Sequence, residues 1–176
     1  MTKKPVHHIL ITGAAGTGTT TLANVLAKEL RTTHLEADDF LWLPSDPPYQ
    51  HMADKTKRGE RLLNEMRAQS RAVVAGSVMG WGRQVENEFD LVVFLYLPVE
   101  LRLARLERRE IERFGQANPE FMAWAAQYDE GGIPGRSLAR HHEWLAERTC
   151  VVLNLEGDMS VSDRVRHILD AVHSGH

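Results

Sequence analysis

The sequence predicts an α/β fold in three layers, with a five-stranded parallel sheet covered by helices on both faces. Five short apolar segments alternate with segments of helical periodicity along the 176 residues, as in a parallel sheet with helical crossovers. The segment Leu91–Leu97 is continuous and apolar, as expected for a parallel strand covered on both faces. The first apolar segment runs straight into a glycine-rich turn that opens a helix. These observations predict a single domain over residues 1–176.

The first half of the chain is expected to supply three strands and two helices. His8–Thr12 is a short apolar strand, and after the glycine turn apolar residues recur at helical spacing, with cations near the helix end. His34–Ala37 is the second strand, and three prolines within Phe40–Tyr49 predict irregular backbone. Asp54–Arg67 is a helix with an apolar stripe, and Ala72–Ala75 is the third strand.

The second half begins with the strand Leu91–Leu97, which Pro98 ends, and a very basic helix over Val99–Arg113. The remaining elements are separated by glycine or proline: helices over Pro119–Tyr128 and Ser137–Glu147, a strand over Cys150–Leu155, and a last helix opened by Ser160. In that last helix Asp163 stands in the capping-box position. The functional loops should follow the strands, because parallel sheets bind ligands beyond the carboxyl ends of their strands.

Composition and charge argue for a cytoplasmic protein that binds small molecules. The chain is 43% hydrophobic, enough for a core, and its net charge of −3 argues against a nucleic-acid partner. Its single cysteine, Cys150, excludes an internal disulfide and fits a reducing cytosol. The apolar run Ile9–Ile11 is too short for a signal sequence or a membrane span, so no membrane partner is expected. The chain is expected to be a monomer or homodimer.

The turn after the first strand, GAAGTGTT, has the glycine spacing of a phosphate-binding loop. Its glycines let consecutive backbone N–H groups point inward as an anion nest, and the helix N-terminus adds about half a positive charge. Thr20 stands in the position of a Mg²⁺ ligand, so ATP and Mg²⁺ are the expected cofactors. The residues expected to bind the nucleotide are Gly13, Ala14, Ala15, Gly16, Thr17, Gly18, Thr19, Thr20 and Thr21. The alternative is a glycine-rich turn that binds nothing.

One position departs from the phosphate-loop pattern, because Thr19 stands where the pattern has lysine. The chain therefore lacks the cation that reaches the β- and γ-phosphates. Lys28 lies nine residues along the helix, about 13 Å away, and Lys3 and Lys4 precede the strand at its wrong end. The replacement charge is expected from Mg²⁺ or from arginines elsewhere. The alternative is a site that binds weakly or not at all.

Three stretches resemble the nucleoside-monophosphate-kinase-like group of P-loop small-molecule kinases, to which adenylate kinases belong. They correspond to the phosphate loop, the start of the lid and the segment against adenine: Gly13–Ala23 (GAAGTGTTTLA), Leu97–Pro98 with Arg105 and Arg109, and Gly157–Asp158. The phosphate loop matches a minority version of the group with threonine in place of lysine. The resemblance implies a P-loop fold with an acceptor-binding insertion at about 40–70, a helical lid at about 114–140, and phosphate transfer to a small molecule.

Two departures from the adenylate-kinase pattern leave the acceptor open. The stretch Ala75–Val78 after the third strand lacks the acid that adenylate-kinase-like members often carry. The stretch Glu36–Phe40 instead resembles small-metabolite and nucleoside kinases, in which an aspartate here takes the proton of the acceptor hydroxyl.

Asp38 and Asp39 are the only acids expected at the carboxyl edge of the sheet near the phosphate loop. Either one could orient an acceptor hydroxyl or hold Mg²⁺ through water. Adjacent residues in extended backbone point opposite ways, so the sequence does not choose between them. The alternative is an aspartate pair that ends a strand and starts a turn.

The catalytic cations are expected from the basic helix and from the segment after the breaker Gly131–Gly135, a candidate lid hinge. Arg105 and Arg109 share one helix face, and Arg136 and Arg140 follow the breaker. Arginine binds phosphate oxygens with a planar fork of donors. The alternative is a solvated face on which glutamates pair with arginines. That interpretation is preferred for two of them: Arg108 and Arg113.

The acceptor is expected between the loop Phe40–Tyr49, the second helix and the loop after the third strand. The candidate acceptor-binding residues are Asp38, Phe40, Trp42, Arg58, Gly76 and Trp81. Core packing is an equal alternative for Phe40 and Trp42. Trp124 and Trp144 fall on helical stripes and are expected in the core.

The leading interpretation is a kinase that moves the γ-phosphate of ATP to a small molecule, with nucleotides and nucleosides among the candidates. A nucleoside triphosphate hydrolase or switch usually has a strand-borne acid for Mg²⁺ and a positioned glutamine or glutamate for water, and neither is evident. A regulatory module that lost catalysis together with its lysine is the third interpretation.

Overall fold

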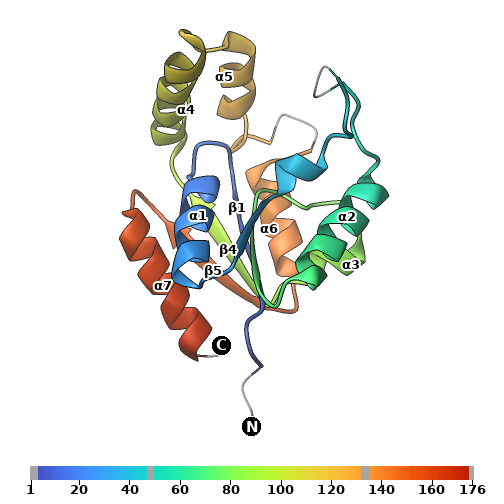
Figure 1. Ribbon diagram of the computed structural model, residues 1–176. Helices are drawn as coiled ribbons and strands as arrows, with labels where there is room; N and C mark the ends of the chain where they lie inside the picture. The colour runs from blue at the N-terminus through green and yellow to red at the C-terminus, as the bar shows by residue number, and fades with distance from the viewer. Residues whose placement is uncertain (1–3, 47–49, 132–134, 175–176) are drawn as a thin grey trace.

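The structure, a computed structural model, describes residues 4–46, 50–131 and 135–174 and contains one five-stranded sheet (Figure 1). The strands are β1 (His8–Gly13), β2 (Thr33–Glu36), β3 (Ala72–Ala75), β4 (Leu91–Tyr96) and β5 (Val151–Glu156). Every pair is parallel, and the order across the sheet is β2-β3-β1-β4-β5. The chain turns from β1 toward one edge and later returns to the other, so the order reverses beside β1, where such sheets bind ligands. The predicted fold class is confirmed.

Helices cover both faces of the sheet (Figure 1). Their bounds are α1 (Thr19–Glu29), α2 (Lys55–Ala68), α3 (Arg83–Glu86), α4 (Val99–Phe114), α5 (Pro119–Ala126), α6 (Leu138–Ala146) and α7 (Val161–Ser174). Alternate residues of the central strands enter two cores, because successive side chains of a strand point to opposite faces. Ile9 and Ile11 pack with α1 and α7, whereas Leu10 packs with α2 and α6. None of the described helices is both long and apolar enough to cross a bilayer.

Local signals explain most helix boundaries. Asp54, Asn118 and Ser137 accept hydrogen bonds from the first-turn amides of α2, α5 and α6, respectively. At α7 the Ser160 hydroxyl accepts from the Asp163 amide, 3.1 Å away. Gly115, in left-handed backbone with φ of 79°, ends α4. Helices α4 and α5 contact each other beyond the carboxyl edge of the sheet, where the lid was expected (Figure 1).

Three expectations about local structure were wrong. Residues 37–40 form a 3₁₀ turn, η1 (Ala37–Phe40), instead of extending the second strand through Ala37. The short helix α3 was not predicted, because four residues are too few to show a helical period. Trp124 does not join either core cluster: it is 38% exposed and lies beside a cavity. Two segments named in the sequence, Phe40–Tyr49 and Gly131–Gly135, lie in part outside the described residues.

Candidate active site

Two adjoining cavities open at the carboxyl edge of the sheet. The first, of about 520 Å³, is formed by the loop after β1, the ends of β2 and β3, the helices α4 and α5, and the start of α7. The second, of about 460 Å³, lies between η1, α2, the loop after β3 and α6. Asp38 and Arg136 line both cavities. The two cavities therefore meet at these side chains.

The loop after β1 has the backbone that phosphate binding requires. Gly16 and Gly18 have φ of 86° and 91°, in the left-handed region that favours glycine. A Cβ on Gly16 would lie 2.8 Å from the Arg102 carbonyl oxygen, so no larger residue fits there. Gly18 precedes α1, and within the described chain no side chain caps this helix end. The first amides of α1 are thus left for an anion in the cavity.

Eight of the nine loop residues predicted to bind the nucleotide line the first cavity, and Thr17 does not. The Thr17 side chain is fully buried, and its hydroxyl donates to the Ala14 carbonyl oxygen at 2.8 Å. Its amide makes a second bond to the same oxygen at 3.2 Å. The Thr17 side chain therefore closes the loop from behind instead of facing a ligand.

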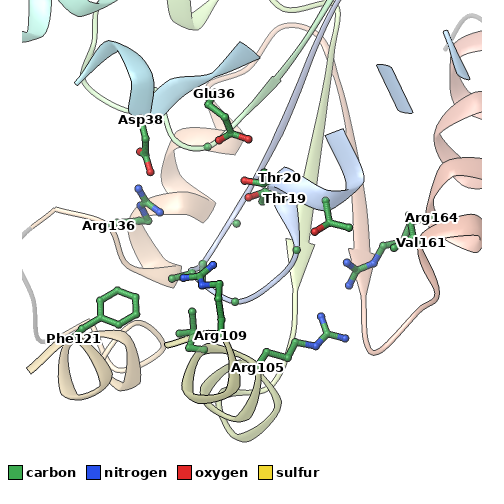
Figure 2. A pocket seen from close by; sticks show the side chains of 18 of the residues that line it. Thr19, Thr20, Glu36, Asp38, Arg105, Arg109, Phe121, Arg136, Val161 and Arg164 are labelled. Atoms are coloured by element: carbon green, nitrogen blue, oxygen red, sulfur yellow. The ribbon is translucent and has the colours of Figure 1, made fainter. Parts of the chain in front are cut away.

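A carboxylate that the sequence analysis missed lies beside the phosphate loop. Glu36, at the end of β2, lines the first cavity, and its carboxylate lies beside the Thr20 hydroxyl (Figure 2). It also pairs with His34 at 2.8 Å. Burial raises the pKa of Glu36, while Thr20 and His34 oppose that rise. The expectation that Asp38 and Asp39 were the only acids at this edge was wrong, because Glu36 was assigned to the strand itself.

The hydroxyl of Thr20 and the carboxylate of Glu36 form a donor set that suits Mg²⁺. This ion prefers oxygen ligands and keeps several waters, so it needs only one or two protein groups besides the nucleotide phosphates. No cluster of three His, Cys, Asp or Glu side chains that could hold a metal occurs among the described residues. The phosphates of the nucleotide would therefore have to complete the coordination.

The 3₁₀ turn places Asp38 and Asp39, between which the sequence did not choose, in different surroundings. Asp38 lines both cavities, and Figure 2 shows its side chain pointing toward Arg136. Asp39, one residue on, is exposed and lines neither cavity. Only Asp38 is placed where it could meet an acceptor.

Four arginines from three parts of the chain line the first cavity: Arg105, Arg109, Arg136 and Arg164 (Figure 2). Arg105 is ion-paired with Asp158. Arg140, the other catalytic candidate, lines only the second cavity. Arg108 and Arg113 are exposed and line neither cavity. The structure thus brings Arg105 and Arg109 to the phosphate loop and adds Arg164, whose position so far along the chain gave no sequence signal.

Of the aromatic acceptor candidates, only Trp81 lines the second cavity. Arg58, also in its wall, is buried; its Nε donates to the Ala53 carbonyl oxygen at 2.6 Å, and its guanidinium lies 5.9 Å from the Trp81 ring centre. Phe40 packs against the core beneath α2, and Trp42 pairs with Met52 in a β-bridge. Core packing, the alternative given for both residues, describes Phe40; Trp42 is partly exposed and belongs to neither core cluster.

Gly76 lines the first cavity instead of the second, at the end of β3. Its φ is 119°, and a Cβ there would lie 2.9 Å from the Ala37 Cβ, so the close approach of β3 to η1 requires glycine. Gly157 and Asp158 line neither of the two cavities, although their neighbours Met159 and Val161 line the first one. The predicted adenine segment is thus near the cavity, but its two named residues contact protein instead.

Behind the phosphate loop lies a buried histidine. His141 in α6 is fully buried; its Nδ1 is 2.5 Å from the Tyr128 hydroxyl oxygen and its Nε2 is 3.5 Å from Thr12 Oγ1. Burial, helped by the positive charge of Arg136, lowers the pKa of His141 to about 3. His141 is therefore neutral at physiological pH and joins β1, which carries the loop, to the end of the α5 segment.

Sequence comparisons with known proteins match most of the chain. A family model described as an AAA domain matches residues 9–121. YqaC of Bacillus subtilis (strain 168), described as an uncharacterized protein, is 37% identical over 182 residues, covering 98% of this chain and 99% of YqaC.

Solved kinase structures share the fold. A shikimate kinase from Acinetobacter baumannii in complex with shikimate aligns with a TM-score of 0.60 and 20% identity, over 98% of this chain and 95% of that one. A gluconokinase from Sinorhizobium meliloti 1021 aligns with a TM-score of 0.59 and 13% identity, over 97% and 94%. At these identities the likeness establishes the fold alone.

Proposed function

The chain belongs to the AAA domain family and has the fold of the P-loop small-molecule kinases, and we propose that it transfers the γ-phosphate of ATP to the hydroxyl of a small anionic acceptor. The observation that carries this proposal is the junction of the two cavities at Asp38 and Arg136. A donor nucleotide on the phosphate loop and an acceptor in the second cavity would meet there. A hydrolase needs no second cavity beside its phosphate site.

The first cavity supplies what a bound triphosphate needs. The amides of the loop and of the first turn of α1 would hold the phosphate oxygens. Thr20 and Glu36 would hold Mg²⁺, which when bound neutralises charge between the β- and γ-phosphates. Arg109 and Arg136, on the side of the second cavity, would stabilise the charge of the phosphoryl group during transfer.

Asp38 would act on the acceptor. The acceptor oxygen forms a bond to the γ-phosphorus, the bond between that phosphorus and the β–γ bridging oxygen breaks, and ADP leaves. The hydroxyl proton passes to the Asp38 carboxylate, whose place at the junction suits this role. Catalysis of this kind depends mostly on positioning and on neutralising charge, which fits a site built from arginines and backbone amides.

The charge of the second cavity favours an acceptor with a carboxylate or phosphate. Four cations line it: Lys55, Arg58, Arg136 and Arg140. Three carboxylates share the wall: Asp38, Glu143 and Glu147. With Asp38 assigned to the hydroxyl, the remaining charges favour an anionic group on the same molecule, and arginine is suited to bind it. Shikimate, the ligand of one structural neighbour, is a hydroxylated carboxylate of this class.

The test is ADP release from ATP and Mg²⁺, measured with and without a panel of acceptors. The panel pairs hydroxylated carboxylates and nucleoside monophosphates with their uncharged counterparts, sugars and nucleosides. We expect ADP release that depends on an anionic acceptor. Release that is independent of any acceptor would mark a hydrolase, and tight ATP binding with no ADP would mark a binding module; either outcome overturns the proposal.

A further inference from the structure

Arg164, in the last helix, is a buried cation in the wall of the first cavity. Its side chain is only 2% exposed, although α7 lies at the surface of the molecule. Nη1 donates to the Thr17 carbonyl oxygen at 2.8 Å, and Nη2 lies 3.3 Å from the Gly157 carbonyl oxygen. Nε is buried and has no hydrogen-bond partner. The guanidinium is thus held by neutral carbonyl groups of the phosphate loop and of the turn before α7.

No carboxylate among the described residues forms an ion pair with Arg164. The carboxylate that interacts electrostatically with Arg164 is that of Asp158, and it is already ion-paired with Arg105. Arg105 is a second positive charge near Arg164. Burial and the charge of Arg105 lower the pKa of Arg164, and Asp158 opposes that change. A buried charge without a counter-ion is costly, so its retention calls for an anion that the protein chain does not provide.

The guanidinium lies against the two residues that precede the missing lysine. It bonds the Thr17 carbonyl, and a Cβ on Gly18 would lie 3.4 Å from Nη1. Thr19, where the phosphate-loop pattern has lysine, is the next residue. Figure 2 shows Arg164 pointing at the start of α1 from the side opposite Glu36 and Asp38. The chain therefore has a fixed positive charge at this point of the loop, supplied from the other end of the sequence.

We propose that Arg164 replaces the lysine of the phosphate loop, as the cation that binds the phosphate chain of the nucleotide. This inference rests on the proposed nucleotide site. Because Arg164 lies across the loop from Asp38, it serves the phosphates that ATP and ADP share, among them the β-phosphate that the lysine reaches, while Arg109 and Arg136 serve the transferred group. The bonds to the two carbonyls hold the guanidinium in place before the ligand arrives.

The test is calorimetric binding of ADP, ATP and adenosine to the variant Arg164→Gln. We expect at least a tenfold loss of affinity for ADP and ATP and no loss for adenosine, which has no phosphate. Arg166→Gln is the matched control, because Arg166 is on the same helix, is exposed and pairs with Asp163. The control should bind all three ligands as the parent does. Equal affinity of Arg164→Gln and the parent for ADP, or an equal loss for adenosine, overturns the proposal.

A second pair of variants separates charge from fold. Arg164→Lys keeps the positive charge but loses the pair of hydrogen bonds to the two carbonyl oxygens, so it should bind ADP better than Arg164→Gln does. If Arg164→Lys binds ADP no better, or if only its folding is impaired, the role of Arg164 is structural. Thr19→Lys should raise ADP affinity by at least tenfold more in the Arg164→Gln background than in the parent. An equal gain in ADP affinity in both backgrounds would mean that Lys at position 19 and Arg164 do not have the same role.

These measurements are distinct from the test of the kinase proposal. A parent that binds ADP through Arg164 but shows no acceptor-dependent turnover contradicts the kinase and supports the role of Arg164. A parent that does not bind ADP contradicts both.

Discussion

The Thr20 hydroxyl, in the first turn of α1, lies close enough to the Glu36 carboxylate, at the end of β2, to oppose the rise that burial causes in the pKa of Glu36. Helix α1 packs against β2 and β3, and the two groups meet at the mouth of the phosphate loop. The charge of this partly buried carboxylate is shared by His34, 2.8 Å away, and a cation at the site would stabilise it further. Mg²⁺ on a bound nucleotide would do so.

Glu36→Gln should raise the Mg²⁺ concentration needed for half-maximal turnover by about 10- to 100-fold, because the amide loses the negative charge that attracts the ion. The measurement is a Mg²⁺ titration of turnover at saturating ATP. Glu29→Gln, at an exposed position on α1, is the control and should leave the titration unchanged. An unchanged titration in Glu36→Gln would remove Glu36 from the metal site.

Asp38→Asn should lower kcat by about 10²- to 10⁴-fold, the range attributed to general base catalysis. Asp39→Asn is a matched control one residue away, since Asp39 is exposed and lines neither cavity. It should leave kcat within about twofold of the parent. Steady-state kinetics on both variants with the acceptor found in the panel decide the matter. Equal effects in the two variants would contradict the assignment made from the 3₁₀ turn.

Arg109→Ala should lower kcat by about 100-fold or more while leaving the unfolding temperature unchanged, because the side chain is exposed and faces the cavity. Arg108→Ala, on the same helix and outside both cavities, is the comparison. The measurements are turnover and thermal unfolding of each variant. If Arg109→Ala turns over as fast as the parent, Arg109 has no catalytic role and belongs to a solvated helix face.

The burial of His141 should make the free energy of unfolding depend on pH. The pKa of His141 in the folded protein is lowered to about 3, below the ordinary value near 6.5, so the unfolded chain binds the proton more tightly. Stability from this group is complete above pH 6.5 and is lost as pH falls toward 3, at up to about 1.4 kcal/mol per pH unit.

His141→Asn should therefore show a shallower fall in the free energy of unfolding between pH 6 and 5 than the parent does. His167→Asn, at an exposed position on α7, should keep the parental slope. Urea unfolding at several pH values gives both slopes. If all three slopes agree, protonation of His141 does not govern stability in this window.

The sequence predicted those parts of the molecule that depend on local pattern. Apolar runs and helical periods located all five strands and six of the seven helices, and the glycine spacing located the phosphate loop. The parts that failed depend on packing. Trp124 looks like a core residue on its helix, but α5 packs against α4 and Trp124 faces the cavity, so the side chain stays partly exposed.

The site was predicted less completely, for the same reason. The choice between Asp38 and Asp39 depends on a 3₁₀ turn, whereas the sequence analysis treated these residues as extended backbone. Glu36 and Arg164 lie at the phosphate loop only because the sheet order and the return of α7 bring them there. No spacing in the sequence relates Arg164 to Thr17, 147 residues earlier.

The central claim is that the backbone amides after β1 bind a nucleotide's phosphates without the usual lysine. Amide-resolved NMR during a titration with ADP and Mg²⁺ tests it most directly. We expect the largest shifts at the amides of Gly16, Gly18 and Thr20, saturating with a single affinity. Unshifted signals at these three amides at millimolar ADP, or larger shifts elsewhere in the protein, would contradict it.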